Sequence, residues 1–297
     1  MQDDAEIKLG LVGTGAWGMN FLKAKAGASG VVLAHVASPH IADKTLPKDI
    51  VRHADWHDLL TLGLDGLIVA TPPQSHAEIS AAALDAGLAV LVEKPVTLSV
   101  TEAEHLRDLA VAQKGILQVG HIDLHNPAFR AMQDSLPARS EIARISGAWS
   151  NAGPWRNDAS PLWDWGPHPL ACCLTLAGFE FSDLQLETES DGQGQLYRLQ
   201  ADFEDIAVDL TFGNGDTRRQ RWMEVESSGH IWRYDDASDI KASEDGRPLV
   251  FSTTPPLTAE IERLANAIRA GVSDTADADL GLAVVKMLRQ LEQIAAS

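Results

Sequence analysis

The stretch WDWGPH, residues 163–168, brings a carboxylate and an imidazole together in an aromatic setting. Asp164 and His168 are four residues apart, about one helical turn, so both can lie on one side of the chain. Histidine exchanges protons near neutral pH, and a neighbouring carboxylate fixes its tautomer and favours its protonated form. We therefore predict that His168 is an acid/base with Asp164 as its partner. The alternative is a capping aspartate beside a histidine at the edge of a core.

Two prolines indicate where the helix after this stretch begins. Pro167 and Pro169 are tolerated only near a helix N-terminus, so HPLACCLTLAG is predicted to be helical from about Gly166. Asp164 and His168 are thereby expected at the N-terminal end of that helix, where catalytic groups can face a cleft.

A second chemical signal is GTGAWG, in which Gly13, Gly15 and Gly18 have the GxGxxG spacing. The first glycine can make the tight turn, the second lets a pyrophosphate approach the backbone, and the third lets a helix pack closely on a strand. Because the motif follows a hydrophobic strand and opens a helix, it predicts a dinucleotide site and not a merely structural turn. The predicted site also includes Thr14, Ala16 and Trp17.

The choice between NAD and NADP usually depends on the end of the second strand of such a domain. A carboxylate there would bind the adenosine ribose and repel a 2′-phosphate. Here Ser38 occupies the expected position, and no carboxylate follows until Asp43. No arginine is present to hold a 2′-phosphate, only His40 and Lys44. The cofactor is therefore predicted to be NAD(P), with a lean to NADP.

Strands and helices alternate over the first 121 residues, which indicates βαβ units and a parallel sheet with helices on both faces. The strands are expected at 7–13, 31–37, 65–71, 88–94 and 115–121, and the helices at about 16–26, 75–87 and 101–113. Gly87 is expected as the glycine just past a helix end. The fold class of this part is α/β, a doubly wound Rossmann domain.

The pattern changes after residue 122. A helix over NPAFRAMQDSL begins with Asn126 as cap and Pro127 at the first position. Period-two alternation then predicts strands with hairpin signals at Asn214-Gly215 and Ser228-Gly229. We expect an α+β domain with a large, mostly antiparallel open sheet. The domains are 1–121, for NAD(P) binding, and 122–297, for substrate binding and oligomerisation; the C-terminal helices can pack back on the first domain.

Composition limits the class of partner. The formal net charge of -18 argues against nucleic acid and anionic membranes, since either would repel the chain. The basic run Arg218–Arg221 is expected to be a solvated strand edge. The start of the sequence has no signal-peptide pattern, so a cytoplasmic location is expected. Cys172 and Cys173 are expected as reduced cysteines in a helix, and no metal, GxSxG or P-loop motif is present.

The segments GTGAWG, VATPPQSHAEISAAALDAG, VEKP and VGHIDLHNPAFR, in this order, resemble the glucose-fructose oxidoreductase / inositol dehydrogenase / MocA (Gfo/Idh/MocA) family. The resemblance implies an NAD(P)-dependent oxidoreductase. It implies that Lys94 stabilises the developing alkoxide, and that Asp164 and His168 match the DxxxH acid/base motif. The cofactor segment is matched by Thr71, Pro72, Pro73, His76 and Glu93.

The sequence also departs from the family pattern. Ala171 stands where many relatives have an acidic residue, and VGHIDLHNP has Asp123, Leu124 and His125 where relatives often have arginine. The cations available for a charged substrate are Arg130 and Arg156. The predicted substrate contacts are Lys94, His121, Trp155, Arg156, Trp163, Asp164 and His168, and Trp155, Trp163 and Trp165 can either stack on a sugar or only pack.

Two functions remain open at this stage. The first is hydride transfer between nicotinamide and a carbinol or carbonyl carbon of a sugar, cyclitol or related polyol, by a homodimer or homotetramer. The second is a non-catalytic NAD(P)- or sugar-binding regulatory protein of the same fold. A third, ranked lower, keeps the enzyme but has an imine or a bilin-like tetrapyrrole as substrate. Measuring cofactor reduction across a panel of sugars separates the first two.

Overall fold

The computed structural model describes residues 6–154, 159–190, 194–273 and 275–296. The chain divides into two compact units. The first comprises residues up to 120 together with 255–285, and the second comprises 121–254 together with 286–297. The sequence-based boundary assigns all of 122–297 to the second domain, so the structure differs in returning residues 255–285 to the first unit.

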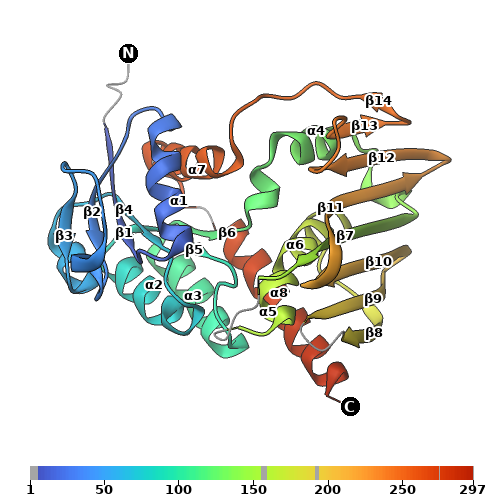
Figure 1. The fold of residues 1–297 in the computed structure, drawn as a ribbon, viewed down its shortest axis with the longest axis horizontal. Helices are drawn as coiled ribbons and strands as arrows, with labels where there is room; N and C mark the ends of the chain where they lie inside the picture. The colour runs from blue at the N-terminus through green and yellow to red at the C-terminus, as the bar shows by residue number, and fades with distance from the viewer. Residues whose placement is uncertain (1–5, 155–158, 191–193, 274, 297) are drawn as a thin grey trace. The chain divides into compact units, whose positions relative to one another are not determined.

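The first unit contains a six-stranded parallel sheet in the order β3-β2-β1-β4-β5-β6 (Figure 1). Its strands are β1 (Ile7–Val12), β2 (Val31–Ala37), β3 (Val51–His53), β4 (Gly66–Val69), β5 (Ala89–Glu93) and β6 (Leu117–Gly120). Five of these lie within the predicted strands. The prediction missed β3, whose three residues are too short a run to show periodicity. The doubly wound fold class is confirmed.

Helices lie on both faces of this sheet, as the βαβ pattern requires (Figure 1). They are α1 (Ala16–Ala24), α2 (His76–Asp85), α3 (Val100–Gln113), α7 (Pro256–Ala270) and the first part of α8 (Ala276–Ala295). The C-terminal helix α7 is bound by polar contacts: Gln118 Nε2 donates to Glu260 O over 3.0 Å, and Thr258 Oγ1 donates to Ala24 O over 3.2 Å. Gly87 follows α2 with φ +77°, as expected for the glycine past a helix end.

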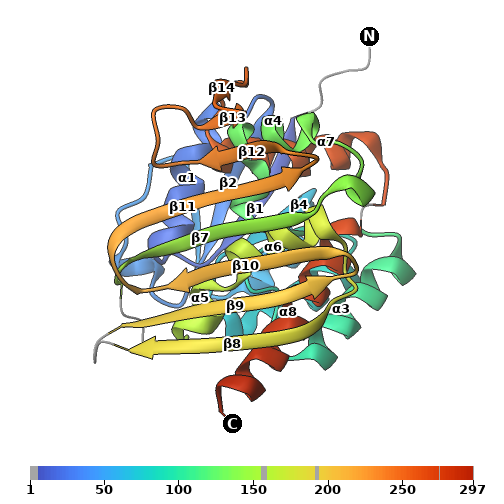
Figure 2. The same ribbon diagram turned by 90° about the vertical axis from the view of Figure 1, so that its right-hand side faces the viewer.

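The second unit contains an eight-stranded sheet in the order β14-β13-β12-β11-β7-β10-β9-β8 (Figure 2). All neighbouring strands are antiparallel except β7 and β10. The strands are β7 (Arg144–Ala152), β8 (Ser182–Ser190), β9 (Gln195–Phe203), β10 (Ile206–Gly213), β11 (Gly215–Ser227), β12 (His230–Asp235), β13 (Ala242–Glu244) and β14 (Arg247–Pro248). The large, mostly antiparallel sheet is confirmed.

One of the two predicted hairpins is wrong. Ser228-Gly229 does join β11 to β12, with both residues at positive φ. Asn214-Gly215 does not form a hairpin, because β7 lies between β10 and β11. Asn214 is buried, and its side chain accepts from Gln195 N and donates to Pro154 O. These contacts hold Asn214 in the connection from β10 to β11, which crosses β7, whereas the dipeptide predicts a tight turn.

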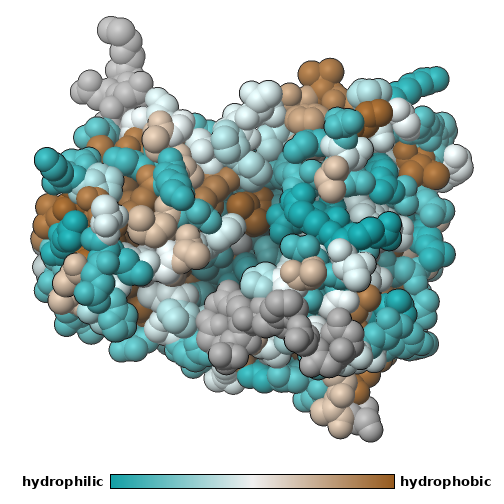
Figure 3. Space-filling model, in the orientation of Figure 1, coloured by the Kyte–Doolittle hydropathy of each residue, from teal (hydrophilic) through white to brown (hydrophobic). Residues whose placement is uncertain are grey.

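The two faces of the second sheet differ in chemistry. Buried Tyr197, Leu199, Leu210 and Phe212 alternate with polar residues, so one face forms a core. The helices α4 (Pro127–Ser135), α5 (Pro161–Trp165) and α6 (Pro167–Ala177) lie on that face, behind the sheet in Figure 2. The other face carries cross-strand ion pairs such as Arg144–Asp209 and Arg198–Glu189. In the view of Figure 3, hydrophilic residues predominate over this unit.

Candidate functional site

The glycine loop between β1 and α1 has the shape that a dinucleotide requires. Gly13 has φ +105°, and a Cβ there would lie 2.4 Å from Ala70 O. A Cβ on Gly18 would lie 2.1 Å from Gly13 O, so only glycine allows this approach of helix and turn. Gly15, in contrast, has nothing within 4 Å of its Cβ position and is exposed, as are Ala16 and Trp17.

The start of α1 offers backbone donors beside that open position. Gly15 is the N-cap, and no side chain caps the helix. The first N–H groups of a helix have no partner within it, and the helix dipole favours an anion there. The open space at Gly15 and these N–H groups fit a pyrophosphate. The loop can therefore hold the dinucleotide that the motif predicts.

Ser38, at the end of β2, is positioned by two hydrogen bonds. Its Oγ accepts from Thr14 Oγ1 over 2.9 Å and from His40 N over 3.3 Å, and both Ser38 and Thr14 are buried. A hydroxyl that accepts two hydrogen bonds still has its own proton to donate. Ser38 can thus donate to an oxygen of a ribose or a phosphate, where a carboxylate would repel the phosphate.

The structure places His76, a predicted cofactor residue, in contact with the backbone, and its cofactor role stays a prediction. The side chain of His76 is 0% exposed, with Nδ1 2.8 Å from Pro95 O and Nε2 2.9 Å from Thr71 O. Burial lowers the pKa of this imidazole, and the nearby Lys94 acts in the same direction. Both ring nitrogens therefore face the protein backbone, and His76 joins the Thr71 loop to the turn after β5.

Lys94 follows β5 directly and is half-buried. Its backbone N–H donates to Glu93 Oε2 over 3.2 Å, and the Lys94-Pro95 peptide is cis. Gly120 on β6 leaves room for the buried Glu93, since a Cβ there would lie 3.2 Å from the Glu93 carboxyl carbon. The main chain that carries Lys94 is thus fixed by neighbours within the first unit.

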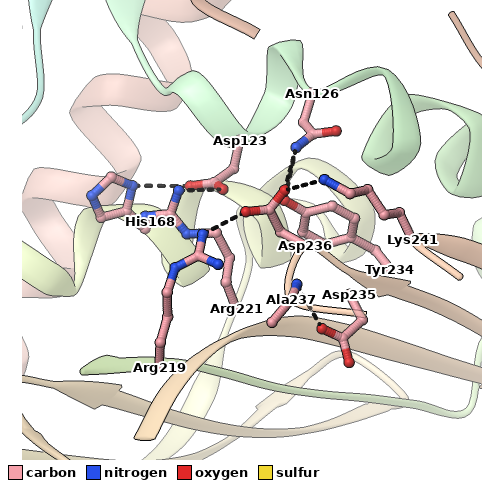
Figure 4. A network of polar contacts seen from close by, with 10 residues as sticks. All are labelled: Asp123, Asn126, His168, Arg219, Arg221, Tyr234, Asp235, Asp236, Ala237 and Lys241. Atoms are coloured by element: carbon pink, nitrogen blue, oxygen red, sulfur yellow. Dashed lines mark hydrogen bonds and ion pairs between the residues drawn. The ribbon is translucent and has the colours of Figure 1, made fainter. Parts of the chain in front are cut away.

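His168, in the first turn of α6, is bound by a carboxylate from outside its own motif. Its Nδ1 lies 3.0 Å from Asp123 Oδ2, and the two side chains are 12% and 3% exposed (Figure 4). Asp164 lies in the separate short helix α5. The carboxylate on Nδ1 is therefore Asp123 and not Asp164, which corrects the predicted orienting partner.

Local backbone structure explains why Asp123 points inward. Residues Ile122–His125 form a 3-10 turn after β6, and Asn126 N donates to Asp123 O over 3.0 Å. Asn126 then caps α4, its Oδ1 accepting from Ala128 N over 3.0 Å as predicted. The turn and the cap together hold the Asp123 side chain among buried neighbours.

A guanidinium keeps Asp123 charged. Burial alone would raise the pKa of this carboxyl, but Arg221, with Nη1 3.6 Å from Asp123 Oδ1, and the hydrogen bond from His168 outweigh it. The net effect holds the pKa of Asp123 well below its ordinary value. Arg221 is 26% exposed, so the expectation that Arg218–Arg221 is a solvated strand edge is wrong for this residue.

A second carboxylate, Asp236, gathers the polar groups around this pair (Figure 4). Arg219 lies 2.5 Å from its Oδ2, and Lys241 lies 3.4 Å from its Oδ1. Asn126 Nδ2 donates to Tyr234 Oη over 3.1 Å and contacts Asp236 Oδ1 at 3.5 Å. The turn after β6, helix α6, strands β11 and β12 and the loop after β12 thus contribute to one polar network in the second unit.

Comparison with known proteins supports one family assignment. Residues 7–121 match the GFO_IDH_MocA profile, described as an oxidoreductase family with an NAD-binding Rossmann fold. A crystal structure of a candidate oxidoreductase from Magnetospirillum magnetotacticum MS-1 superposes with a TM-score of 0.87 and 29% identity, over 96% of this chain and 99% of that one. These similarities support membership of the Gfo/Idh/MocA family, and the family model itself covers residues 7–121.

Curated relatives match over a shorter part of their length. The rhizopine catabolism protein MocA of Rhizobium meliloti is 32% identical over 44% of this chain and 43% of its own length. Inositol 2-dehydrogenase 1 of Saccharopolyspora erythraea is 33% identical over 45% of this chain and 42% of its own length. The match thus spans less than half of each of these two relatives, and their activities are not transferred by it.

Two of the three tryptophans that could contact a sugar, Trp163 and Trp165, lie within the described residues. Trp163 is 4% exposed, its Nε1 donates to Glu292 over 2.9 Å, and Arg289 lies 4.8 Å above its ring. These contacts favour the packing alternative for Trp163, and a sugar contact stays a prediction. Trp165 is partly exposed and stays open, and Trp155 and Arg156 lie outside the described residues.

The remaining predicted residues have the following positions. His121 is 3% exposed and Arg130 lies on the exposed side of α4, and a substrate role of either stays a prediction. Cys172 and Cys173 are free, buried thiols in α6, as predicted. Among the described residues, no three metal-ligating side chains gather, and none of the helices is long and apolar enough to cross a bilayer.

Proposed function

We propose that this protein is an NAD(P)-dependent oxidoreductase that acts on a CH–OH or carbonyl carbon of a sugar, cyclitol or related polyol. The observation that carries the proposal is the His168–Asp123 hydrogen bond in a Gfo/Idh/MocA fold. A regulatory protein that only binds a nucleotide has no need of an imidazole oriented by a buried, charged carboxylate.

The hydrogen bond assigns different tasks to the two imidazole nitrogens. Because Asp123 accepts the proton of Nδ1, the neutral ring leaves the lone pair on Nε2. Nε2 removes the hydroxyl proton as the carbinol carbon is oxidised, and returns it in the reverse direction. The charged Asp123 stabilises the imidazolium that forms, and this makes Nε2 of His168 a stronger base.

Lys94 has an electrostatic role in this proposal. Bound NAD(P) would supply the hydride acceptor or donor, and the glycine loop at Gly13–Gly18 would hold its pyrophosphate. The Lys94 ammonium would stabilise negative charge on the substrate oxygen, as the family resemblance implies. The backbone contacts to Glu93 and His76 would restrict the turn from which this lysine extends.

The cofactor is proposed to be NADP in preference to NAD. Ser38 supplies a hydroxyl proton and no negative charge at the end of β2. The KM values for NADP and NAD should therefore differ in favour of NADP, and Ser38→Asp should reverse that order, because a carboxylate repels a 2′-phosphate. Equal KM values in the wild type would contradict this preference.

Turnover is the main test of the proposed function. NAD(P) reduction should be observed with at least one member of a panel of aldoses, cyclitols and their acids, and Lys94→Ala and His168→Ala should each lower kcat by orders of magnitude. Both variants should still bind the nucleotide. His230→Ala is a matched control, since His230 is an exposed residue paired with Asp245. Full turnover in both site variants would overturn the mechanism.

The homo-oligomer and the cytoplasmic location stay predictions.

A further inference from the structure

Arg221 lies on the covered face of the second sheet, where charged residues are rare. It shares a face of β11 with Met223 and Val225, which are fully buried, whereas Trp222 and Glu224 alternate with them. Arg221 therefore continues an apolar stripe with a charged side chain that is 26% exposed. Solubility does not explain a cation on a face of the sheet that is otherwise buried and apolar.

The guanidinium of Arg221 has more donors than the described part of the chain uses. It carries five N–H groups in a planar fork. Among the described residues, Asp123 is the single carboxylate within 4.0 Å of it, reached by Nη1 at 3.6 Å. The ion pair holds the group in place but leaves most of the fork available to a ligand on its exposed side.

The other cations of this region each form an ion pair with a carboxylate. Arg219 and Lys241 both lie on Asp236, and Arg233 pairs with Glu224 and Asp235. The network drawn in Figure 4 contains three cations, Arg219, Arg221 and Lys241, and three carboxylates, Asp123, Asp235 and Asp236. Including Arg233 and its partner Glu224 gives four of each. Arg221 differs from the other cations because the carboxylate it approaches, Asp123, also accepts a hydrogen bond from His168. A guanidinium with donors to spare can bind an anionic group.

We propose that Arg221 binds an anionic group of the substrate, so that the polyol or sugar on which His168 acts carries a carboxylate or a phosphoryl group. This inference rests on the proposed function. Arg221 and His168 approach the two oxygens of the same Asp123 carboxylate, so a hexose-sized molecule can reach both. A guanidinium fork matches the two oxygens of either anion.

Matched substrates test the charge requirement. Glucose, gluconate, glucuronate and glucose 6-phosphate, and the corresponding galactose and mannose sets, are compared by kcat/KM with NADP and NAD. The charged member of at least one set is expected to exceed its neutral counterpart by roughly tenfold or more. Whether carboxylates or phosphates are preferred identifies the source of the anion. Neutral sugars that equal their charged counterparts in every active set would overturn the proposal.

Substitution of Arg221 separates recognition from positioning. Arg221→Gln should raise KM for the charged substrate about ten- to hundredfold and leave KM for its neutral counterpart unchanged. Arg221→Lys should recover only part of the affinity, because an ammonium cannot form the bidentate pair. Arg198→Gln, on the opposite face of the same sheet and paired with Glu189, is the matched control. Because Arg221 also keeps Asp123 charged, kcat should fall for both substrates. A fall in kcat with no difference in KM between charged and neutral substrates would mean that Arg221 only supports Asp123, and would overturn the proposal.

A binding measurement distinguishes this proposal from the proposed function. Tryptophan fluorescence titrations with gluconate, glucuronate and the sugar phosphates report binding without turnover. Saturable binding that is lost in Arg221→Gln, with no cofactor reduction by any sugar, would retain the anion site and overturn the dehydrogenase. Turnover of a charged substrate with the same KM in the wild type and in Arg221→Gln would retain the dehydrogenase and overturn the anion site.

Discussion

The glycine loop of the first unit and the histidine network of the second are built in different ways. The loop is six consecutive residues, Gly13–Gly18, whose shape follows from backbone sterics. The network joins Asp123, His168 and Arg221, which come from a 3-10 turn, a helix and a strand. A local motif is recognisable from its spacing, whereas a network of distant residues exists only once the chain has folded.

The two regions also differ in how they respond to substitutions. In the loop, a single added carbon either collides with backbone, as at Gly13 and Gly18, or enters open space, as at Gly15. In the network, an isosteric change leaves the packing in place and alters only charge and hydrogen bonding. Variants of the loop should therefore act on folding or nucleotide binding, and variants of Asp123 and His168 on the chemical step.

The largest expected effect separates the two aspartates. Asp123→Asn should lower kcat by roughly 10²- to 10³-fold, because an amide can present its N–H to Nδ1 and so favour the wrong imidazole tautomer. Loss of the carboxylate also disfavours the imidazolium, so the acidic limb of the kcat/KM profile should move to lower pH. Asp164→Asn is the comparison, and steady-state kinetics across pH is the measurement. A greater loss of kcat and a shifted acidic limb in Asp164→Asn would mean that Asp164, and not Asp123, orients His168.

The next effect concerns two glycines of the loop. Gly18→Ala should lower the free energy of unfolding by about 3 kcal/mol, since its Cβ would lie 2.1 Å from Gly13 O. Gly15→Ala should change stability by less than about 0.5 kcal/mol, because its Cβ meets no atom within 4 Å. It should nevertheless weaken nucleotide binding at least tenfold, as measured by fluorescence titration. If Gly15→Ala binds the nucleotide normally, the pyrophosphate does not approach there.

A smaller effect tests the packing role of Trp163. Trp163→Phe removes the hydrogen bond to Glu292 and should cost about 1–2 kcal/mol in urea unfolding. KM for any substrate should stay within twofold of the wild type. Trp222→Phe, on the open face of the sheet, is the control with a smaller loss of stability. A raised KM with unchanged stability would restore Trp163 as a sugar platform.

The smallest expected effect is a pH dependence of stability. The folded protein holds the pKa of Asp123 below its ordinary value, so the charged form stabilises the fold above the unfolded-chain pKa of about 3.9. This contribution is lost as the pH falls further. Burial of the ion pair offsets part of the gain, which keeps the effect small. The difference in unfolding free energy between wild type and Asp123→Asn should narrow from pH 7 to pH 3, and a constant difference would contradict the charged state.

Periodicity and local motifs were sufficient to predict the larger elements. The strands of the first sheet, the cap at Asn126 and the helix start near Gly166 all follow from residue types within a few positions. The missed elements were short, like β3, and the wrong hairpin at Asn214-Gly215 arose because strand β7, distant in sequence, pairs between the two strands concerned. The alternation of Met223 and Val225 with Glu224 did contain a usable signal that Arg221 points inward.

The sequence by itself determined the doubly wound first unit, the nucleotide loop and the identity of His168 as the candidate base. Each of these depends on steric or chemical properties of neighbouring residues. Only the tertiary structure decided that Asp123 orients His168, that Arg221 keeps Asp123 charged, and that His76 and Trp163 make packing contacts. Those outcomes depend on which distant side chains share a buried space, because electrostatic and hydrogen-bond energies follow distance in space and not position along the chain.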